Sequence, residues 1–309
     1  MTPDLSVSLG TLKLRNPVLV AAGTFGYGLE FSRAIKLQEL GGIVTKTVTR
    51  LPREGNAPPR LAETPSGMLN AVGLQNVGLE ALLSDKLPKL CDVGTPVIVS
   101  LLGETPQEIA EMVSRTDQAP GVAAIELNLS CPNVRHATAK QNGRCVVLVA
   151  QDAELVEEMV AACRQKTKKP LIAKLSPDVA DLSPIAQAAE RAGADAVTIA
   201  NTYVGMSWDA HARRSRLGTL TGGLSGPAIR ALSVYRVWYT VPAIHIPIIG
   251  LGGIVRAEDA IEFFLAGARV VAVGTANFAN PRAALQVVKG LKSYLEKHNI
   301  PSIAALRPA

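Results

Sequence analysis

A cysteine follows an apolar, strand-like run in this 309-residue chain. In IELNLSCPNV (125–134), apolar residues alternate with polar ones until the chain turns at Cys131-Pro132-Asn133, which is the pattern of a strand that ends in a turn. A lone cysteine is often only a small core residue. At a strand end with cations nearby, however, its thiolate can remove a proton as a general base. Cys131 is therefore a candidate catalytic residue.

Polar residues also end several other apolar runs. The carboxyl ends of parallel strands gather on one side of a sheet or barrel, so two lysines, several amides and the thiol are expected to converge there. Lys174 is costly to bury unpaired, so it either meets a carboxylate or faces a ligand that acquires negative charge. The residues at the run ends are Lys46-Thr47, Ser100, Asn128 to Asn133, Lys174, Asn201-Thr202, Gly252-Gly253 and Gly274-Thr275.

The glycines among these run-end residues favour a phosphate-binding site. Gly252-Gly253 and Gly274-Thr275 end two consecutive runs, and glycine lets backbone N–H groups approach a ligand closely. One glycine pair is equally well explained by a tight turn, whereas two neighbouring sites indicate a phosphate site. LTGGLSGPAI (220–229) is a further glycine-rich segment, interpreted as a loop.

The elements that must position these residues alternate in type. Apolar runs, each bounded by Gly, Pro or Asn, are separated by stretches with helical periodicity, such as ETPQEIAEMVSR with Thr105 as the expected N-cap. This alternation predicts an α/β fold, a (β/α)₈ TIM barrel, with an N-terminal β-hairpin around Gly10-Thr11. We expect one domain over residues 1–309. The runs span 16–22, 41–47, 95–103, 123–130, 169–176, 195–202, 246–253 and 269–275.

Composition and charge argue against several classes of function. The formal charge is +6, but aromatic residues make up only 4% of the chain and do not interleave with the basic ones, which disfavours nucleic acid as a partner. No apolar run is long enough to span a bilayer and no signal peptide is visible, so we expect a cytoplasmic protein without a membrane partner. The four cysteines form no C-x-x-C pair, and no metal site is predicted.

Seven motifs together resemble class 1 dihydroorotate dehydrogenase. The resemblance runs from about residue 5 to residue 303, and its last motifs are more similar to the NAD-linked class 1B catalytic subunit than to the fumarate-linked class 1A enzyme. The motifs are NAVGLQNVG (70–78), ELNLSCPNV, AKLSPDV, ANTYVG, TGGLSGPAI, IIGLGGI and VAVGTANF.

This resemblance implies oxidation of (S)-dihydroorotate to orotate in pyrimidine synthesis, with FMN in this chain. It further implies an electron-transfer partner subunit carrying FAD and a [2Fe–2S] cluster, on a homodimer core of a heterotetramer. Cys131 would be the base. The implied substrate-binding residues are Lys46, Asn70, Ala71, Val72, Gly73, Leu74, Asn128, Asn201 and Thr202. The implied FMN contacts are Ala22, Lys46, Thr47, Ser100, Asn128, Lys174, Ala200, Gly226, Gly252, Gly253, Gly274 and Thr275.

The sequence departs from the family pattern at three places. Ala22 and Ser100 stand where the family commonly has Ser and Asn, and residues 135–154 replace a shorter glycine-rich stretch. The alternatives are the fumarate-linked class, a tRNA-dihydrouridine synthase-like flavoenzyme and a catalytically silent flavin-binding barrel. The tRNA-modifying enzyme would need an RNA-binding extension. The presence of Cys131, Lys46 and Lys174 together argues against the catalytically silent barrel.

Overall fold

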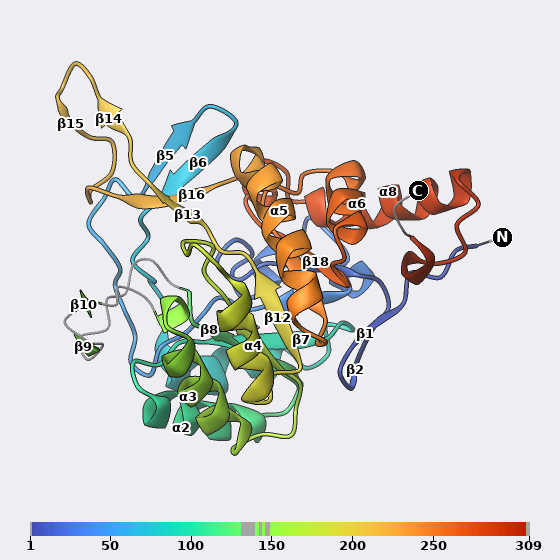
Figure 1. Ribbon diagram of the computed structural model, residues 1–309, viewed down its shortest axis with the longest axis horizontal. Helices are drawn as coiled ribbons and strands as arrows, with labels where there is room; N and C mark the ends of the chain where they lie inside the picture. The colour runs from blue at the N-terminus through green and yellow to red at the C-terminus, as the bar shows by residue number, and fades with distance from the viewer. Residues whose placement is uncertain (1, 131–139, 142–143, 146–148, 307–309) are drawn as a thin grey trace.

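The computed structural model describes residues 2–130, 140–141, 144–145 and 149–306. Eight parallel strands close into a barrel and follow one another around it in chain order, which confirms the predicted TIM barrel (Figure 1). Each predicted run coincides with one strand, although β8 begins one residue before its run. The barrel strands are β3 (Val18–Val20), β4 (Gly42–Val44), β7 (Val97–Leu101), β8 (Val122–Asn128), β11 (Leu171–Lys174), β12 (Ala196–Ile199), β17 (Ile248–Leu251) and β18 (Val270–Val273).

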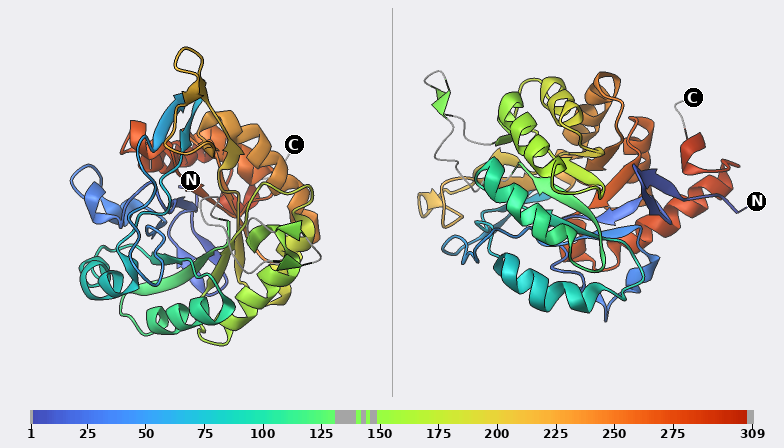
Figure 2. Two further views of the ribbon diagram at one scale, coloured as in Figure 1. Left: turned by 90° about the vertical axis from the view of Figure 1, so that its left-hand side faces the viewer. Right: turned by 90° about the horizontal axis from the view of Figure 1, so that it is seen from below.

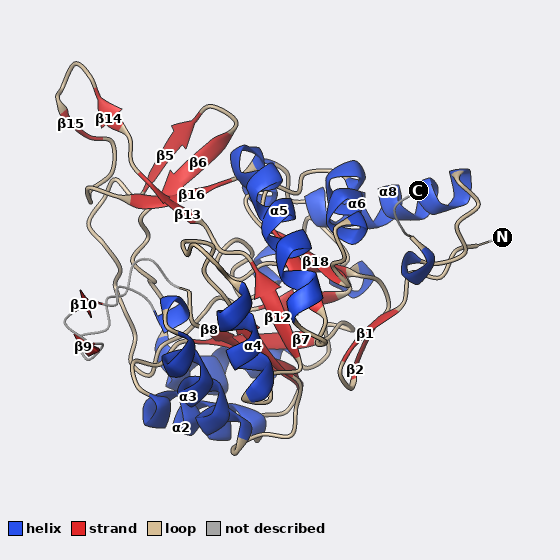
Figure 3. Cartoon of the chain, viewed as in Figure 1, coloured by secondary structure: helices blue, strands red, loops and turns tan. Residues whose placement is uncertain are grey.

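Helices surround the strands (Figure 2) and connect most of them (Figure 3). The strands read as continuous apolar runs because helices cover their outer faces while side chains fill the barrel. The helices are α1 (Gly78–Ala81), α2 (Pro106–Asp117), α3 (Ala153–Arg164), α4 (Ser183–Arg191), α5 (Arg230–Thr240), α6 (Ala257–Leu265), α7 (Ala276–Ala279) and α8 (Ala283–Lys297). Shorter helical turns span Leu29–Phe31, Leu37–Glu39, Leu82–Lys86, Leu87–Leu90, Val149–Gln151, Pro227–Ile229, Val241–Ala243 and Ile303–Ala305.

Single residues mark the helix ends, and the predicted N-cap Thr105 is among them. The Thr105 hydroxyl accepts a hydrogen bond from the Glu108 N–H, and Pro106 begins α2. The Asp152 carboxylate caps α3 in the same way. Gly193 and Gly267 follow α4 and α6 with positive φ angles of 95° and 104°, which terminate each helix just before the next strand.

The predicted N-terminal hairpin is present, and it packs at the amino pole of the barrel. Strands β1 (Val7–Leu9) and β2 (Leu12–Leu14) pair antiparallel, and Gly10 turns between them with φ +55°. A Cβ on Gly10 would lie 3.2 Å from the carboxylate of Asp195, the residue that immediately precedes β12. The hairpin therefore lies beside the amino ends of the strands. Leu9 and Leu14 are buried in the barrel's core.

A small antiparallel sheet stands at the opposite, carboxyl pole, and the sequence did not predict it. Its strand order is β13-β16-β6-β5, and the β14–β15 hairpin projects beyond it (Figure 1). The sheet brings residues near 70 beside residues near 223. Its strands are β5 (Leu61–Thr64), β6 (Gly67–Asn70), β13 (Tyr203–Gly205) and β16 (Gly222–Ser225). The two-residue strands are β9 (Lys140–Gln141), β10 (Arg144–Cys145), β14 (Trp208–Asp209) and β15 (Arg214–Ser215).

Within the described ranges, the helices are all too short or too polar to cross a lipid bilayer.

Candidate active site

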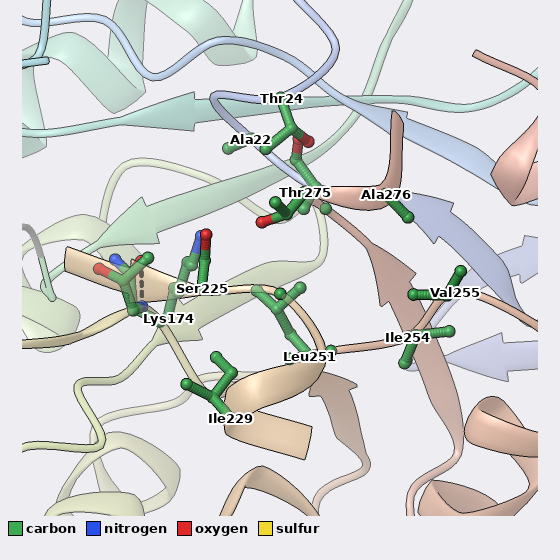
Figure 4. A pocket seen from close by; sticks show the side chains of 17 residues that line it. Ala22, Thr24, Lys174, Ser225, Ile229, Leu251, Ile254, Val255, Thr275 and Ala276 are labelled. Atoms are coloured by element: carbon green, nitrogen blue, oxygen red, sulfur yellow. Dashed lines mark hydrogen bonds between the residues drawn. The ribbon is translucent and has the colours of Figure 1, made fainter. Parts of the chain in front are cut away.

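A cavity of about 530 Å³ opens at the carboxyl ends of the barrel strands, the end at which TIM barrels hold their active sites. Segments after β3, β11, β12, β16, β17 and β18 all contribute to its wall (Figure 4). Its lining residues are Ala21, Ala22, Thr24, Lys174, Asn201, Thr202, Ser225, Gly226, Ile229, Leu251, Gly252, Gly253, Ile254, Val255, Gly274, Thr275 and Ala276.

A second compartment of about 770 Å³ adjoins the first. The two share seven lining residues, including Lys174 and Asn201, so together they form one elongated mouth. The second compartment is lined by Ala22, Gly23, Thr24, Lys46, Thr47, Leu61, Met68, Asn70, Val72, Leu74, Asn128, Lys174, Asn201, Thr202, Ser225, Thr275 and Phe278.

Glycine backbone builds one side of the first compartment. Gly252 and Gly253 have φ angles of 135° and 73°, and a Cβ on Gly252 would lie 2.3 Å from the Ser233 hydroxyl oxygen. A Cβ on Gly253 would lie 2.7 Å from the Arg230 Cβ, at the start of α5. Only glycine fits this close approach of the β17 loop to α5. The resulting wall of backbone beside a helix start suits a phosphate group.

Two lysines line the mouth. Lys174 ends β11, and only 4% of it is exposed. Its ammonium group makes no hydrogen bond or ion pair with the described residues. A cation that is buried this deeply needs a polar or anionic partner, so Lys174 is available to a ligand in the cavity. Lys46 lines the second compartment, and its backbone N–H donates to the Gly26 carbonyl.

Hydroxyls and amides connect the mouth to the barrel interior. The Asn128 amide donates to the Thr47 hydroxyl at 3.1 Å, and the Thr47 and Ser100 hydroxyls lie 2.9 Å apart. Ser100 in turn donates to the Glu126 carboxylate at 2.9 Å. All four side chains are buried. The mouth therefore rests on a second layer of polar groups that fixes the side chains above it.

A second set of hydrogen bonds joins β8 to β12. The Asn201 amide donates to the Ser130 hydroxyl at 2.9 Å and to the Ser130 carbonyl at 3.2 Å. Ser130 donates to the Asn128 side-chain carbonyl at 3.2 Å. Asn70, on β6, donates to the Gly223 carbonyl of β16. The three asparagines thus reach the same mouth from the barrel and from the small sheet.

The structure gathers most of the predicted site residues at this mouth. Lining it are Ala22, Lys46, Thr47, Asn70, Val72, Leu74, Asn128, Lys174, Asn201, Thr202, Gly226, Gly252, Gly253, Gly274 and Thr275. The predicted residues that do not line it are Ala71, Gly73, Ser100 and Ala200. Ser100 lies one layer deeper, beneath Thr47. Cys131 and half of the 135–154 segment lie outside the described residues.

Several lining residues were not singled out from the sequence. Thr24, Ile254 and Val255 lie just beyond predicted strand ends, where a longer window would have included them. Phe278 closes the quoted motif VAVGTANF, but a lone aromatic residue gives no signal for a cavity. Ser225 lies within the glycine-rich segment that was interpreted as a loop.

Ionisable groups away from the mouth have structural roles. Burial raises the pKa of Asp178. The hydrogen bond that its carboxylate accepts from the Val204 N–H lowers this pKa, but by less. That contact fixes β13 where it leaves the mouth. Burial also raises the pKa of the Cys163 thiol to about 12, so Cys163 is an inert core residue. Among the residues that the structure describes, no cluster of His, Cys, Asp and Glu could hold a metal ion.

Comparison with known proteins gives one consistent answer. The family model for dihydroorotate dehydrogenase matches residues 4–295. The chain is 49% identical to the "Dihydroorotate dehydrogenase B (NAD(+)), catalytic subunit" of Pelobacter propionicus, over 99% of this chain and 98% of the relative. Its identity to the protein of the same name from Trichlorobacter lovleyi is 50%, over the same shares of the two chains.

A solved structure supports the fold alone. The crystal structure of DHODH from Eimeria tenella in complex with ferulenol superposes with a TM-score of 0.80 at 23% identity. The superposition covers 98% of this chain and 87% of the other.

Proposed function

The chain belongs to the dihydroorotate dehydrogenase family, and on that premise we propose how it works as the catalytic subunit of an NAD-linked enzyme. It oxidises (S)-dihydroorotate to orotate in de novo pyrimidine synthesis. Near-full-length identity of about 50% to relatives that carry this name supports the assignment. What remains to be proposed is the cofactor, the role of each residue and the route by which electrons leave.

FMN is the cofactor that the mouth fits. The glycine wall around Gly252 and Gly253 offers backbone donors for one phosphate, beside the start of α5. The adjoining polar compartment offers Lys174, the single observation that carries the proposal: a buried cation facing the cavity. When bound, FMN supplies the acceptor for the hydride from substrate carbon C6. A fixed cation stabilises negative charge where that charge develops.

The proposed FMN contacts are of two kinds. Some residues would meet the cofactor through their backbone or a small side chain, and the others through a polar side chain. Ser100, one layer deeper, acts through Thr47. The proposed contacts that line the mouth are Ala22, Lys46, Thr47, Asn128, Lys174, Gly226, Gly252, Gly253, Gly274 and Thr275. Ala200 is proposed from the family resemblance, although it does not line the mouth.

The substrate lies in the second compartment, beside Lys46. Its carboxylate and ring amides need cations and amide donors, which Lys46, Asn70, Asn128 and Asn201 supply. Thr202 and the 71–74 segment complete this set. Cys131 is the base that removes the C5 proton. The residue before it supports this role, because Ser130 is buried and bonded to Asn128 and Asn201 at the mouth.

Electrons leave through a partner subunit that carries FAD and a [2Fe–2S] cluster, bound to a homodimer of this chain. The mouth has an apolar rim that suits such a docking surface: Val255 is 41% exposed and Phe278 is 54% exposed, and each lines a compartment. A partner that covers this rim would lie beside the cofactor.

Parallel turnover assays test the electron route. The purified chain is assayed with dihydroorotate and NAD⁺, fumarate or a dye, with and without the partner subunit. We expect the chain alone to reduce the dye and to use NAD⁺ poorly, and efficient NAD⁺ reduction to require the partner. Strong fumarate turnover by the chain alone would place it in the fumarate-linked class. Strong NAD⁺ turnover without a partner would contradict the two-subunit proposal.

A further inference from the structure

A buried carboxylate lies below the mouth and has no role in the function proposed above. Glu126, on β8, is 3% exposed, and it pairs in register with Ser100 of β7. One carboxylate oxygen accepts the Ser100 hydroxyl at 2.9 Å, and the other accepts the Thr198 hydroxyl at 3.4 Å. No described cation forms an ion pair with it. A buried acceptor of this kind imposes a direction on the hydrogen bonds around it.

The direction can be followed from Glu126 outward. The Ser100 hydroxyl has a single hydrogen, which it donates to the carboxylate. At the 2.9 Å contact between Ser100 and Thr47, Thr47 must therefore be the donor. With its own hydrogen committed, Thr47 can only accept from the next group, and the Asn128 amide nitrogen stands there at 3.1 Å. A flipped Asn128 would place two acceptors against each other.

The same direction continues across to β12. With its nitrogen held toward Thr47, Asn128 presents its side-chain carbonyl to the Ser130 hydroxyl at 3.2 Å. Ser130, having donated its hydrogen, accepts from the Asn201 amide nitrogen at 2.9 Å. The Asn201 side-chain carbonyl then accepts the Thr202 N–H at 2.8 Å. The Asn201 amide also donates to the Ser130 carbonyl at 3.2 Å, so backbone groups fix the orientation of Asn201 on their own. The acceptor at the barrel's interior sets the amide orientation of Asn128, which lines the mouth.

We propose that Glu126 is a positioning residue for the reaction. Acting through Ser100 and Thr47, it holds Asn128 with its amide donor and carbonyl acceptor in one fixed arrangement. The identity of the ligand that meets this arrangement, orotate beside FMN, rests on the proposed function. A tenfold change in affinity corresponds to about 1.4 kcal/mol, which lies within the cost of leaving a buried donor or acceptor mispaired.

Glu126→Gln tests the proposal with almost no change in shape. A glutamine can either donate to Ser100 or accept from it, so the hydrogen bonds lose their single direction. We expect the orotate Kd of the FMN-loaded protein, measured from the shift that orotate causes in the flavin spectrum, to rise about tenfold. The thermal midpoint should stay the same or rise, because a neutral amide is cheaper to bury than an unpaired carboxylate. A merely structural role would instead lower the midpoint.

Two further variants locate the effect. Ser100→Ala cuts the connection between Glu126 and Thr47, so it should raise the orotate Kd as much as Glu126→Gln does, and the double variant should be no worse than either single one. Ser100→Ala also carries the test if Glu126→Gln fails to fold. The matched control is Thr198→Val, which removes the other hydroxyl from the same carboxylate but leaves the chain of hydrogen bonds intact. Its orotate Kd should stay within about twofold of the parent.

The outcomes separate this inference from the function on which it rests. A parent that binds both FMN and orotate, with Glu126→Gln and Ser100→Ala binding orotate equally tightly, contradicts the inference alone. Additive effects of the two substitutions also contradict it, because they would then act independently. A parent that binds neither FMN nor orotate contradicts the proposed function as well.

Discussion

The two poles of the barrel are built in opposite ways. At the amino pole, the β1–β2 hairpin packs apolar side chains such as Leu9 and Leu14 into the core. At the carboxyl pole, strand ends and a small sheet surround an elongated mouth lined by lysines, amides and glycine backbone. The difference indicates that the amino pole supplies stability, while the carboxyl pole uses buried polar groups for binding and chemistry.

The proposed division between the two poles fails if the hairpin contributes nothing to stability. Leu9→Ala removes a fully buried side chain and leaves a cavity, so it should cost about 2–5 kcal/mol of stability. FMN and orotate affinities of the folded protein should not change, because the hairpin lies at the other pole from the mouth. Thermal melts paired with FMN titrations measure both quantities. A Leu9→Ala protein that melts like the parent but binds FMN weakly would reverse the division between the poles.

Lys174→Met should show the converse pattern. Methionine keeps much of the buried volume but removes the cation that faces the cavity. Since a hydrogen bond to a charged group contributes about 1.5–3 kcal/mol, FMN should bind roughly 10–100-fold more weakly. The thermal midpoint of the FMN-free protein should hold or rise, because the substitution removes a buried cation without a described partner. An FMN affinity equal to the parent's would show that Lys174 does not meet the cofactor.

The barrel could be predicted because its signals are local. Each strand is a short apolar run bounded by turn residues, and helix ends such as Thr105 and Gly193 are marked by single residues with a clear physical role. Placing Lys46 and Lys174 at one mouth needed only the rule that parallel strands share a carboxyl edge. For this reason the predicted binding residues largely coincide with the observed lining.

The small sheet could not be predicted because its pairing is not local. Strand β16 pairs with β6 across about 150 residues, Gly223 beside Asn70. Both segments contain glycine, and the segment 220–229 was interpreted as a loop. The sequence also does not show how deep in the barrel a side chain lies. Ser100 was expected at the mouth, but it lies beneath Thr47 because side chains fill the barrel in layers. Glu126 opens the motif ELNLSCPNV, but nothing in the sequence assigned it a role, since that role depends on hydrogen-bond partners from two other strands.

Anaerobic mixing of the FMN-loaded chain with dihydroorotate tests the central claim most directly. We predict that the visible absorbance of the flavin is lost in a single turnover without any partner subunit. Cys131→Ala should keep FMN and orotate binding but nearly abolish this bleaching. Cys131→Ser should bleach slowly, with its optimum at higher pH, because a hydroxyl is a far weaker acid than a thiol. A flavin that stays oxidised in the parent, or that bleaches at the parental rate in Cys131→Ala, would contradict the proposed chemistry.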